Sequence, residues 1–143
     1  MTSVVASVRE RLTSEGLFKR TGGLAELSRA MEAGQFAEDA YVGLVGRESA
    51  ENTTSTFKHT QRSEVRFAVV QIHRTRNRSP RDDFADDVEA KSDAVINTLA
   101  GWTPSPQMDP VAHATGATLE VVPGFVIWSD EFTTAYHIRT DQR

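Results

Sequence analysis

The C-terminal segment Gly124 to Arg139 holds the densest group of large apolar residues in the chain, and it constrains the fold most. From Phe132 onward, apolar and β-branched residues alternate with other types, which predicts a β-strand with one packed face. The residues expected on that face are Phe132, Thr134, Tyr136 and Ile138. The polar tripeptide Ser129-Asp130-Glu131 interrupts the apolar run. It indicates either the tight turn of a hairpin or a bulge within one long strand, and the pattern does not distinguish the two.

A second long strand is predicted over residues 60–74. Val65, Phe67 and Val69 would lie on one face, and Ala68, Val70 and Ile72 on the other. Because apolar residues occupy both faces only over the second half, we expect this strand to lie near the centre of the sheet, with that half covered on both sides. Shorter strands are expected at 40–45 and 118–122, and residues 17–20 are a further candidate.

Three segments have helical spacing. Residues 3–15 form a short amphipathic pattern closed by Gly16, and residues 24–33 form another, closed by Gly34. Residues 81–100 are preceded by Ser79-Pro80, a typical helix start, and carry four aspartates near their N-terminal end. The apolar stripe of this last helix comprises Phe84, Val88, Val95, Leu99 and Trp102. We interpret the aspartates as favourable helix N-terminal charges and not as a metal site.

Two connections stand out. Residues 46–60 are the most polar segment, and they indicate either a hairpin arm projecting from the sheet or a solvated loop. Residues 102–116 are a proline-rich connection, and Pro123-Gly124 is a turn before the last strand. The sequence therefore predicts a single α+β domain over residues 1–143, with a mainly antiparallel sheet of four or five strands and two or three packed helices.

Composition and motifs give no support for an enzyme. The chain has no cysteine, which excludes thiolate catalysis and disulfides, and its net charge of −4 gives no overall attraction for nucleic acid. The histidines at 59, 73, 113 and 137 lack metal-ligand spacing, and no phosphate loop or nucleophile motif is found. No apolar run reaches the ~18 residues that a membrane-spanning helix needs. We expect no enzymatic activity, no cofactor, no metal and no membrane partner.

The basic segment after the second long strand has two interpretations. Arg74, Arg76, Arg78 and Arg81 lie close together in sequence, which could indicate a phosphate-binding patch. No aromatic residue is interleaved to stack on bases, and aspartates follow at once. We therefore favour contact with an acidic protein surface and expect no specific nucleic-acid partner.

The end of the chain also carries a family resemblance. Gly101-Trp102-Thr103-Pro104, followed after a loop by Trp128-Ser129-Asp130-Glu131-Phe132 with Thr134, Tyr136 and Arg139, resembles the end of a tailed-phage tail terminator protein. The order of the other elements agrees with that family, so the resemblance covers most of the chain. Trp128, Phe132 and Tyr136 match the pattern, and we interpret them as packing residues.

The resemblance implies a structural virion protein. Such proteins form a ring, usually of six subunits, on the last ring of the tail tube, where they stop tube polymerisation and present a surface to the neck or head-completion protein. The implied partners are other copies of the chain, the tail-tube protein and the neck protein. The implied location is the head-proximal end of the virion tail, with assembly in the host cytoplasm. The alternatives are a neck or head–tail connector protein and, from another class, a small-molecule-binding α+β domain.

Two sets of residues follow as hypotheses. Exposed polarity and position indicate partner contacts at Arg47, Glu48, Phe57, Lys58, Arg74, Arg76 and Arg78. The residues expected in the core or in subunit packing are Phe67, Val95, Leu99, Trp102, Trp128, Phe132, Tyr136 and Ile138.

Overall fold

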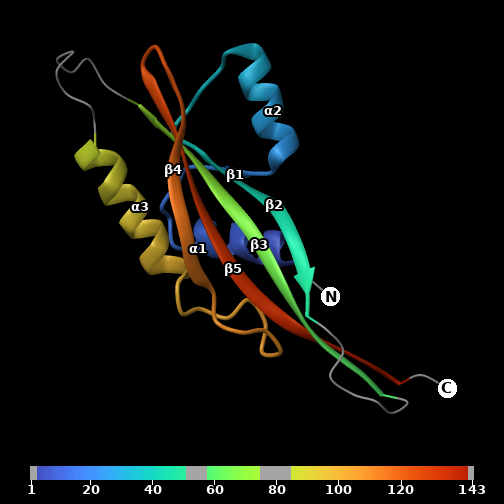
Figure 1. Cartoon of the computed structure of the whole chain (residues 1–143). Coiled ribbons are helices and arrows are strands. Elements are labelled where there is room, and N and C mark those ends of the chain that lie inside the picture. The colour runs from blue at the N-terminus through green and yellow to red at the C-terminus, as the bar shows by residue number, and fades with distance from the viewer. Residues whose placement is uncertain (1–2, 51–57, 75–84, 142–143) are drawn as a thin grey trace.

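The computed structural model describes residues 3–50, 58–74 and 85–141, with the backbone alone at 58–60 and 139–141. It has an α+β fold in which helices cover a five-stranded sheet (Figure 1). The elements in chain order are α1 (Val4–Ser14), β1 (Thr21–Gly22), α2 (Leu24–Ala33), β2 (Ala40–Ser49), β3 (Lys58–Arg74), α3 (Ala85–Leu99), β4 (Ala112–Val122) and β5 (Phe125–Asp141). The predicted fold class is confirmed.

The sheet has the strand order β1-β2-β3-β5-β4. Only β1 and β2 pair in parallel, and the other three pairings are antiparallel, so the sheet is mixed. The central strands β3 and β5 pair without interruption from Arg74 opposite Phe125 to Lys58 opposite Asp141. The position predicted for the second long strand, near the centre of the sheet, is confirmed.

The tripeptide Ser129–Glu131 is neither a turn nor a bulge in the pairing with β3. It lies within β5 in continuous register, and the hairpin that joins β4 to β5 turns at Pro123-Gly124, where Gly124 has a φ of 83°. The hairpin alternative was therefore wrong, and of the second alternative the single long strand is confirmed but the bulge is not. Asp130 continues the buried face of β5 and is only 1% exposed. Its hydrogen-bond donors, described below, make that burial possible.

Other strand boundaries also differ from those predicted. The first strand lies at Thr21–Gly22 and not at 17–20, β2 continues to Ser49, and β4 begins ten residues after Trp102. The backbone of Thr140 and Asp141 is paired with β3. For β2, β4 and the end of β5, backbone pairing with the long central strands sets the strand length, whereas β1 pairs with β2. Polar side chains are compatible with such pairing when they face solvent.

The helix ends follow local chemistry. The Ser3 hydroxyl accepts a hydrogen bond from the Ala6 N–H at 3.0 Å and caps α1. Gly16 and Gly34 follow α1 and α2 with φ values of 68° and 64°, in the left-handed region that glycine adopts without strain. Gly101, with a φ of 83°, has the same role after α3. The expected start of that helix, residues 79–84, lies outside the described residues.

One face of the sheet packs against α1 and α3 (Figure 1). Phe67 and Phe132 lie opposite each other on β3 and β5 and stack with ring centroids 5.5 Å apart. Both are fully buried. The other buried members of this core are Val8, Leu12, Phe18, Ala40, Val42, Val69, Val95, Leu99 and Val111.

The second face is covered only over the end of the sheet nearest α2. Its buried residues are Tyr41, Val70, Ile72 and Ile127, with Leu27, Phe36 and Phe125 packed against them. No residue of α2 is fully buried, although its apolar spacing resembles that of a packed helix. The reason is that α2 lies over the edge of the sheet. Its Leu24 side chain lies over Gly43 and remains 50% exposed.

Replacing Phe132 with alanine should lower the free energy of unfolding by ~3–5 kcal/mol, because it leaves a cavity beside Phe67. Urea unfolding followed by circular dichroism measures this change. The neighbouring Thr133→Ala, on the other face, is the matched control and should change stability by less than about 1 kcal/mol. Equal effects of the two variants would contradict the assignment of Phe132 to the core.

Candidate assembly interface

Both outer edges of the sheet are open over several residues. Strand β1 covers only Ala40 and Tyr41, so β2 from Val42 to Ser49 has no strand on its outer side within the described chain. Strand β4 forms the opposite edge, and nearly all of its residues are exposed. We name these two segments the β2 edge and the β4 edge. Unpaired backbone N–H and C=O groups along such edges can bind another strand.

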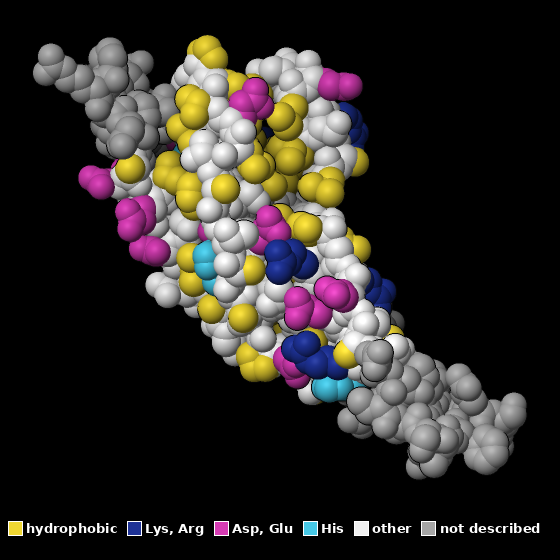
Figure 2. Space-filling model, in the orientation of Figure 1, with side chains coloured by type: hydrophobic (Ala, Val, Ile, Leu, Met, Phe, Trp, Pro, Cys, Tyr) yellow, Lys and Arg dark blue, Asp and Glu magenta, His cyan; other side chains and the backbone are white. Residues whose placement is uncertain are grey.

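Large apolar side chains are exposed on these same edges. Leu44 and Val45 on the β2 edge and Leu119 and Val121 on the β4 edge have between 50 and 69% of their surface exposed. Leu24 and Met31 on α2 are also exposed. Figure 2 shows hydrophobic side chains gathered over α2 and the β4–β5 hairpin, whereas charged side chains occupy the lower half of this face. An apolar surface of this kind is typical of a protein contact.

The buried carboxylate of Asp130 holds β4 to the rest of the fold. Its Oδ2 accepts hydrogen bonds from Gln71 Nε2 at 2.8 Å, Ser92 Oγ at 2.8 Å and Trp128 Nε1 at 3.0 Å. These donors come from β3, α3 and β5. A carboxylate is costly to bury unless such donors replace water, so the four side chains depend on one another.

The other oxygen of Asp130 faces the β4 edge. His113 Nε2 lies 3.0 Å from Asp130 Oδ1, with 29% of the histidine side chain exposed. Gly116 also lies over this site, since an added Cβ would be 2.7 Å from Asp130 Oδ1 and 2.7 Å from the Trp128 ring. Only glycine therefore allows β4 to approach β5 this closely.

A two-stranded ribbon extends beyond both edge strands. Beyond the pair Ser63–Tyr136, β3 and β5 remain paired with each other, while the paired part of β2 ends at Ser49. Ion pairs lie on one face at the base of the ribbon: Arg62 contacts Asp109 at 3.2 Å and Glu64 at 3.6 Å. These groups are 40 to 48% exposed, so they contribute little stability and instead leave charge available at the surface.

The predicted contact residues fall into two separate places. Arg47 and Glu48 are exposed on the β2 edge, and the Arg47 guanidinium lies 5.0 Å from the Tyr136 ring centre. Arg74 ends β3 at the opposite end of the sheet, with its guanidinium 5.6 Å from the Phe125 ring. Lys58 begins β3 at the tip of the ribbon. Phe57, Arg76 and Arg78 lie outside the described residues.

The predicted packing residues are placed as follows. Phe67, Val95, Leu99 and Phe132 are fully buried in the larger core. The half-buried members of the set are Trp102, Trp128, Tyr136 and Ile138. The indole of Trp102 packs against the core under the Arg11 guanidinium, 5.4 Å from its ring centre.

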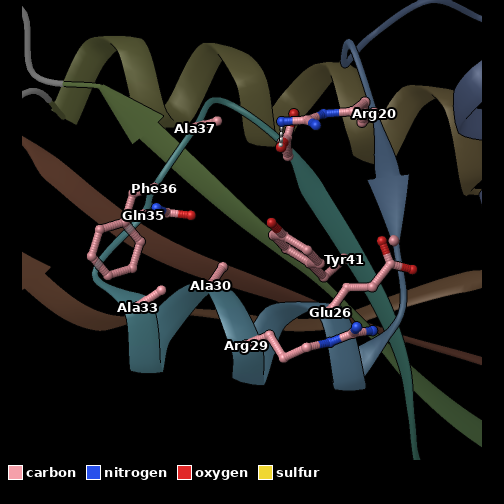
Figure 3. Close-up of a pocket in the computed structure, with 11 residues that line it drawn as sticks. Arg20, Glu26, Arg29, Ala30, Ala33, Gln35, Phe36, Ala37 and Tyr41 are labelled. Carbon is pink, nitrogen blue, oxygen red and sulfur yellow. Dashed lines mark hydrogen bonds and ion pairs between the residues drawn. The ribbon is translucent and has the colours of Figure 1, made fainter.

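A hollow of about 590 Å³ lies between α2 and the N-terminal start of β2 (Figure 3). Its lining residues are Arg20, Gly22, Glu26, Arg29, Ala30, Ala33, Gln35, Phe36, Ala37, Asp39 and Tyr41. The charged groups already have partners: Arg20 pairs with Asp39 at 3.2 Å, and Glu26 accepts from the Gly23 N–H at 3.4 Å. Burial and then the Asp39 carboxylate raise the pKa of Tyr41. The Tyr41 hydroxyl is therefore protonated at neutral pH.

A second hollow, of about 750 Å³, lies between the 17–20 segment, the end of β3 and α3. Lys91 donates to the Leu17 carbonyl and lies over the Phe18 ring. Burial, with a smaller contribution from Lys91, lowers the pKa of His73. Its Nε2 has no hydrogen-bond partner within the described part of the chain.

The residues around Asp130 were not predicted from the sequence, and no role was expected for His113, Gly116 or Ser92. The available signal was an aspartate at a core position of a strand, which requires donors from elsewhere in the fold. Within residues 3–50, 58–74 and 85–141, no group of three or more acidic, histidine or cysteine side chains could hold a metal ion.

Comparison with known proteins assigns the chain to a family. A family model described as phage tail terminator protein matches residues 2–143. The chain therefore belongs to the phage tail terminator family, and the predicted resemblance is confirmed. Membership gives it a structural role in the phage tail. A search of the curated proteins returns no match. None of the helices in the described ranges is long and apolar enough to cross a membrane.

Replacing Asp130 with alanine should lower the free energy of unfolding by about 3 kcal/mol or more, since it leaves Gln71, Ser92 and Trp128 with unpaired donors. Chemical denaturation measures the change. Glu131→Ala is the matched control, because Glu131 is adjacent and makes only a partly exposed ion pair with Arg66, at 3.7 Å. A loss of under 1 kcal/mol for Asp130→Ala would show that the carboxylate does not organise this part of the fold.

Proposed function

We propose that this protein forms a ring on the end of the phage tail tube, stops tube polymerisation there and provides the interface to the neck or head. The match of the terminator family over residues 2–143 is the observation that carries this proposal. The ring, with six subunits the expected number, contains copies of this chain, and its partners are the tail-tube protein and the neck protein. Its activity is the recognition of these partners and not catalysis.

The surface of the protomer supports a role in assembly. The β2 and β4 edges lie on opposite sides of the sheet, and each exposes apolar side chains. A ring needs two such different surfaces on each subunit, because every copy contacts one neighbour on each side. The half-buried Trp128 and Tyr136 are available for packing at subunit boundaries.

The two groups of contact residues support two distinct ends of the ring. Arg47 lies opposite Val65, nine residues along β3 from Arg74. At about 3.3 Å per residue, the two arginines are separated by ~30 Å along the strands. If the ring axis runs along the strands, Arg47 and Glu48 face one end of the ring and Arg74 faces the other. We assign the Arg47 end, where β2 ends at Ser49, to the tail tube and the Arg74 end to the neck.

The two alternative functions, a neck or connector protein and a small-molecule-binding domain, have less support. A neck or connector protein would use the same kinds of surface but would prefer partners on the head side. A small-molecule-binding domain would present an apolar pocket with polar groups directed at a ligand. In the hollow of Figure 3, Arg20 and Asp39 instead bind each other. No observation on this chain favours either alternative.

The proposal is tested with headless tail tubes and protein carrying a gold label on an N-terminal tag. Electron microscopy should show label at one end of each tube only, and tubes that carry it should stop growing. Gold-labelled tag without the protein is the control. Label along the whole tube would indicate a tube or decoration protein. Unlabelled tubes would contradict the terminator function and leave the connector and ligand-binding functions as candidates.

Reversing charge at the two ends should separate the two contacts. Arg47→Glu should reduce tube-end labelling at least tenfold while leaving neck-protein binding unchanged, and Arg74→Glu should have the opposite effect. The variants are matched because each arginine lies over one aromatic ring, so each loses a similar stabilising contact. Pull-down with purified neck protein and counts of labelled tube ends measure the two activities. Equal loss of both activities in both variants would contradict the assignment of two ends.

A further inference from the structure

We propose that neighbouring copies of this chain join edge to edge, with the β4 edge of one copy pairing antiparallel to the β2 edge of the next. This inference rests on the proposed ring and names the surfaces that close it. The partner is thus a second copy of the chain, bound through backbone hydrogen bonds and flanking apolar side chains.

Strand directions favour this junction. The four long strands alternate in direction across the sheet, in the order β2, β3, β5 and β4. An even number of alternating strands makes the two edges run in opposite directions. When a second copy is related by rotation about an axis along the strands, its β2 therefore runs antiparallel to the β4 that it meets, and the alternation continues from one copy to the next.

The strand registers place residues 42–46 of β2 and residues 112–116 of β4 at the same level along the strand direction. Gly46 pairs with Arg66, Arg66 with Thr133, and Thr133 with Ala112. By the same pairings, Leu44 is level with His113 and Val42 with Gly116. A neighbour that is not displaced along the axis therefore brings residues 112–116 of one copy against residues 42–46 of the next.

Irregularities in the two edges also coincide. The pairing of β2 shifts between Leu44 and Gly46, which makes Val45 the extra residue. The pairing of β4 shifts at two places, and the shift between His113 and Thr115 makes Ala114 an extra residue at this height, while the other lies between Thr118 and Glu120. Bulges increase local twist and bend a strand. Because the two bulges are at nearly the same height, both edges bend at the level where they would meet.

Lysine and proline, which hinder strand addition, are absent from Val42–Ser49 and from Ala112–Val122. The charged residues Arg47, Glu48 and Glu120 lie outside the stretches 42–46 and 112–116 that would meet. Where the two edges would meet, the β2 edge exposes Leu44 and Val45, whereas Leu119 and Val121 lie farther along β4, level with the start of β2 and beyond. A two-fold dimer through β4 alone would leave the β2 edge uncovered, whereas a head-to-tail junction covers residues 42–46 and 112–116 together.

The absence of cysteine makes the junction directly testable by cross-linking. Two full-length variants, Gly46→Cys and Ala112→Cys, each carry a single thiol at one side of the proposed junction. Both positions accept the change, since Ala112 is exposed and a Cβ at Gly46 meets nothing within 4 Å. A short bismaleimide is added to the concentrated proteins, alone and with tail tubes, and the products are separated on a denaturing gel.

The equal mixture of the two variants should give cross-linked dimers at a yield at least tenfold above either variant alone. The double variant should give a ladder that ends at the ring size. Cross-linking of Ala112→Cys alone would overturn the inference in favour of a β4–β4 two-fold pair. Absence of cross-links both in solution and on tubes would also overturn it. Ala90→Cys, an exposed alanine on α3 and on neither edge, is the matched control. Combined with Gly46→Cys in place of Ala112→Cys, it should give no ladder.

The outcomes for the junction and for the proposed function are distinguishable. Labelled tube ends without cross-links between Gly46→Cys and Ala112→Cys would retain the terminator function and reject this junction. Cross-linked rings that never bind tube ends would retain the junction and reject the function.

Discussion

The burial of the Asp130 carboxylate is the constraint on which the arrangement of elements around β4 depends. Three donors converge on one of its oxygens from β3, α3 and β5, and His113 on β4 lies against the other. A buried carboxylate is tolerated only when its hydrogen bonds are satisfied, so α3 must lie where Ser92 reaches the sheet. The strand β4 must in turn carry glycine at 116, because any side chain there would collide with Asp130 and Trp128.

The uninterrupted pairing of β3 with β5 defines the long direction of the sheet. Each of these strands is 17 residues long, and their ladder extends past the shorter neighbours on both sides. Helices α1 and α3 cover one face of this pair, while α2 covers only one end of the other face (Figure 1). The result is a fully packed face, a half-covered face and two open edges. Those uncovered surfaces are available to other chains.

This division separates the polar groups used for folding from those left at the surface. The buried polar groups, such as Gln71 and Ser92, satisfy a carboxylate and so are used for folding. The exposed charged groups pair loosely across the surface, as Arg62 does with Asp109 and Glu64. Weak surface ion pairs of this kind select partners and orientation more than they stabilise the fold. The apolar edges would supply the association energy.

Sequence alone determined the fold class, the central strand, the positions of α1 and α2, and the alternation of faces along β5. These features depend on local periodicity and on caps such as Ser3 and Gly34, which neighbouring residues decide. The family was also recognisable from residues around Trp102 and Trp128. Tertiary structure alone decided that Asp130 is buried, that the Ser129–Glu131 segment continues a strand, and where β2 and β4 end. Those outcomes depend on donors and strand partners distant in sequence, and no local pattern records which strand will lie beside another.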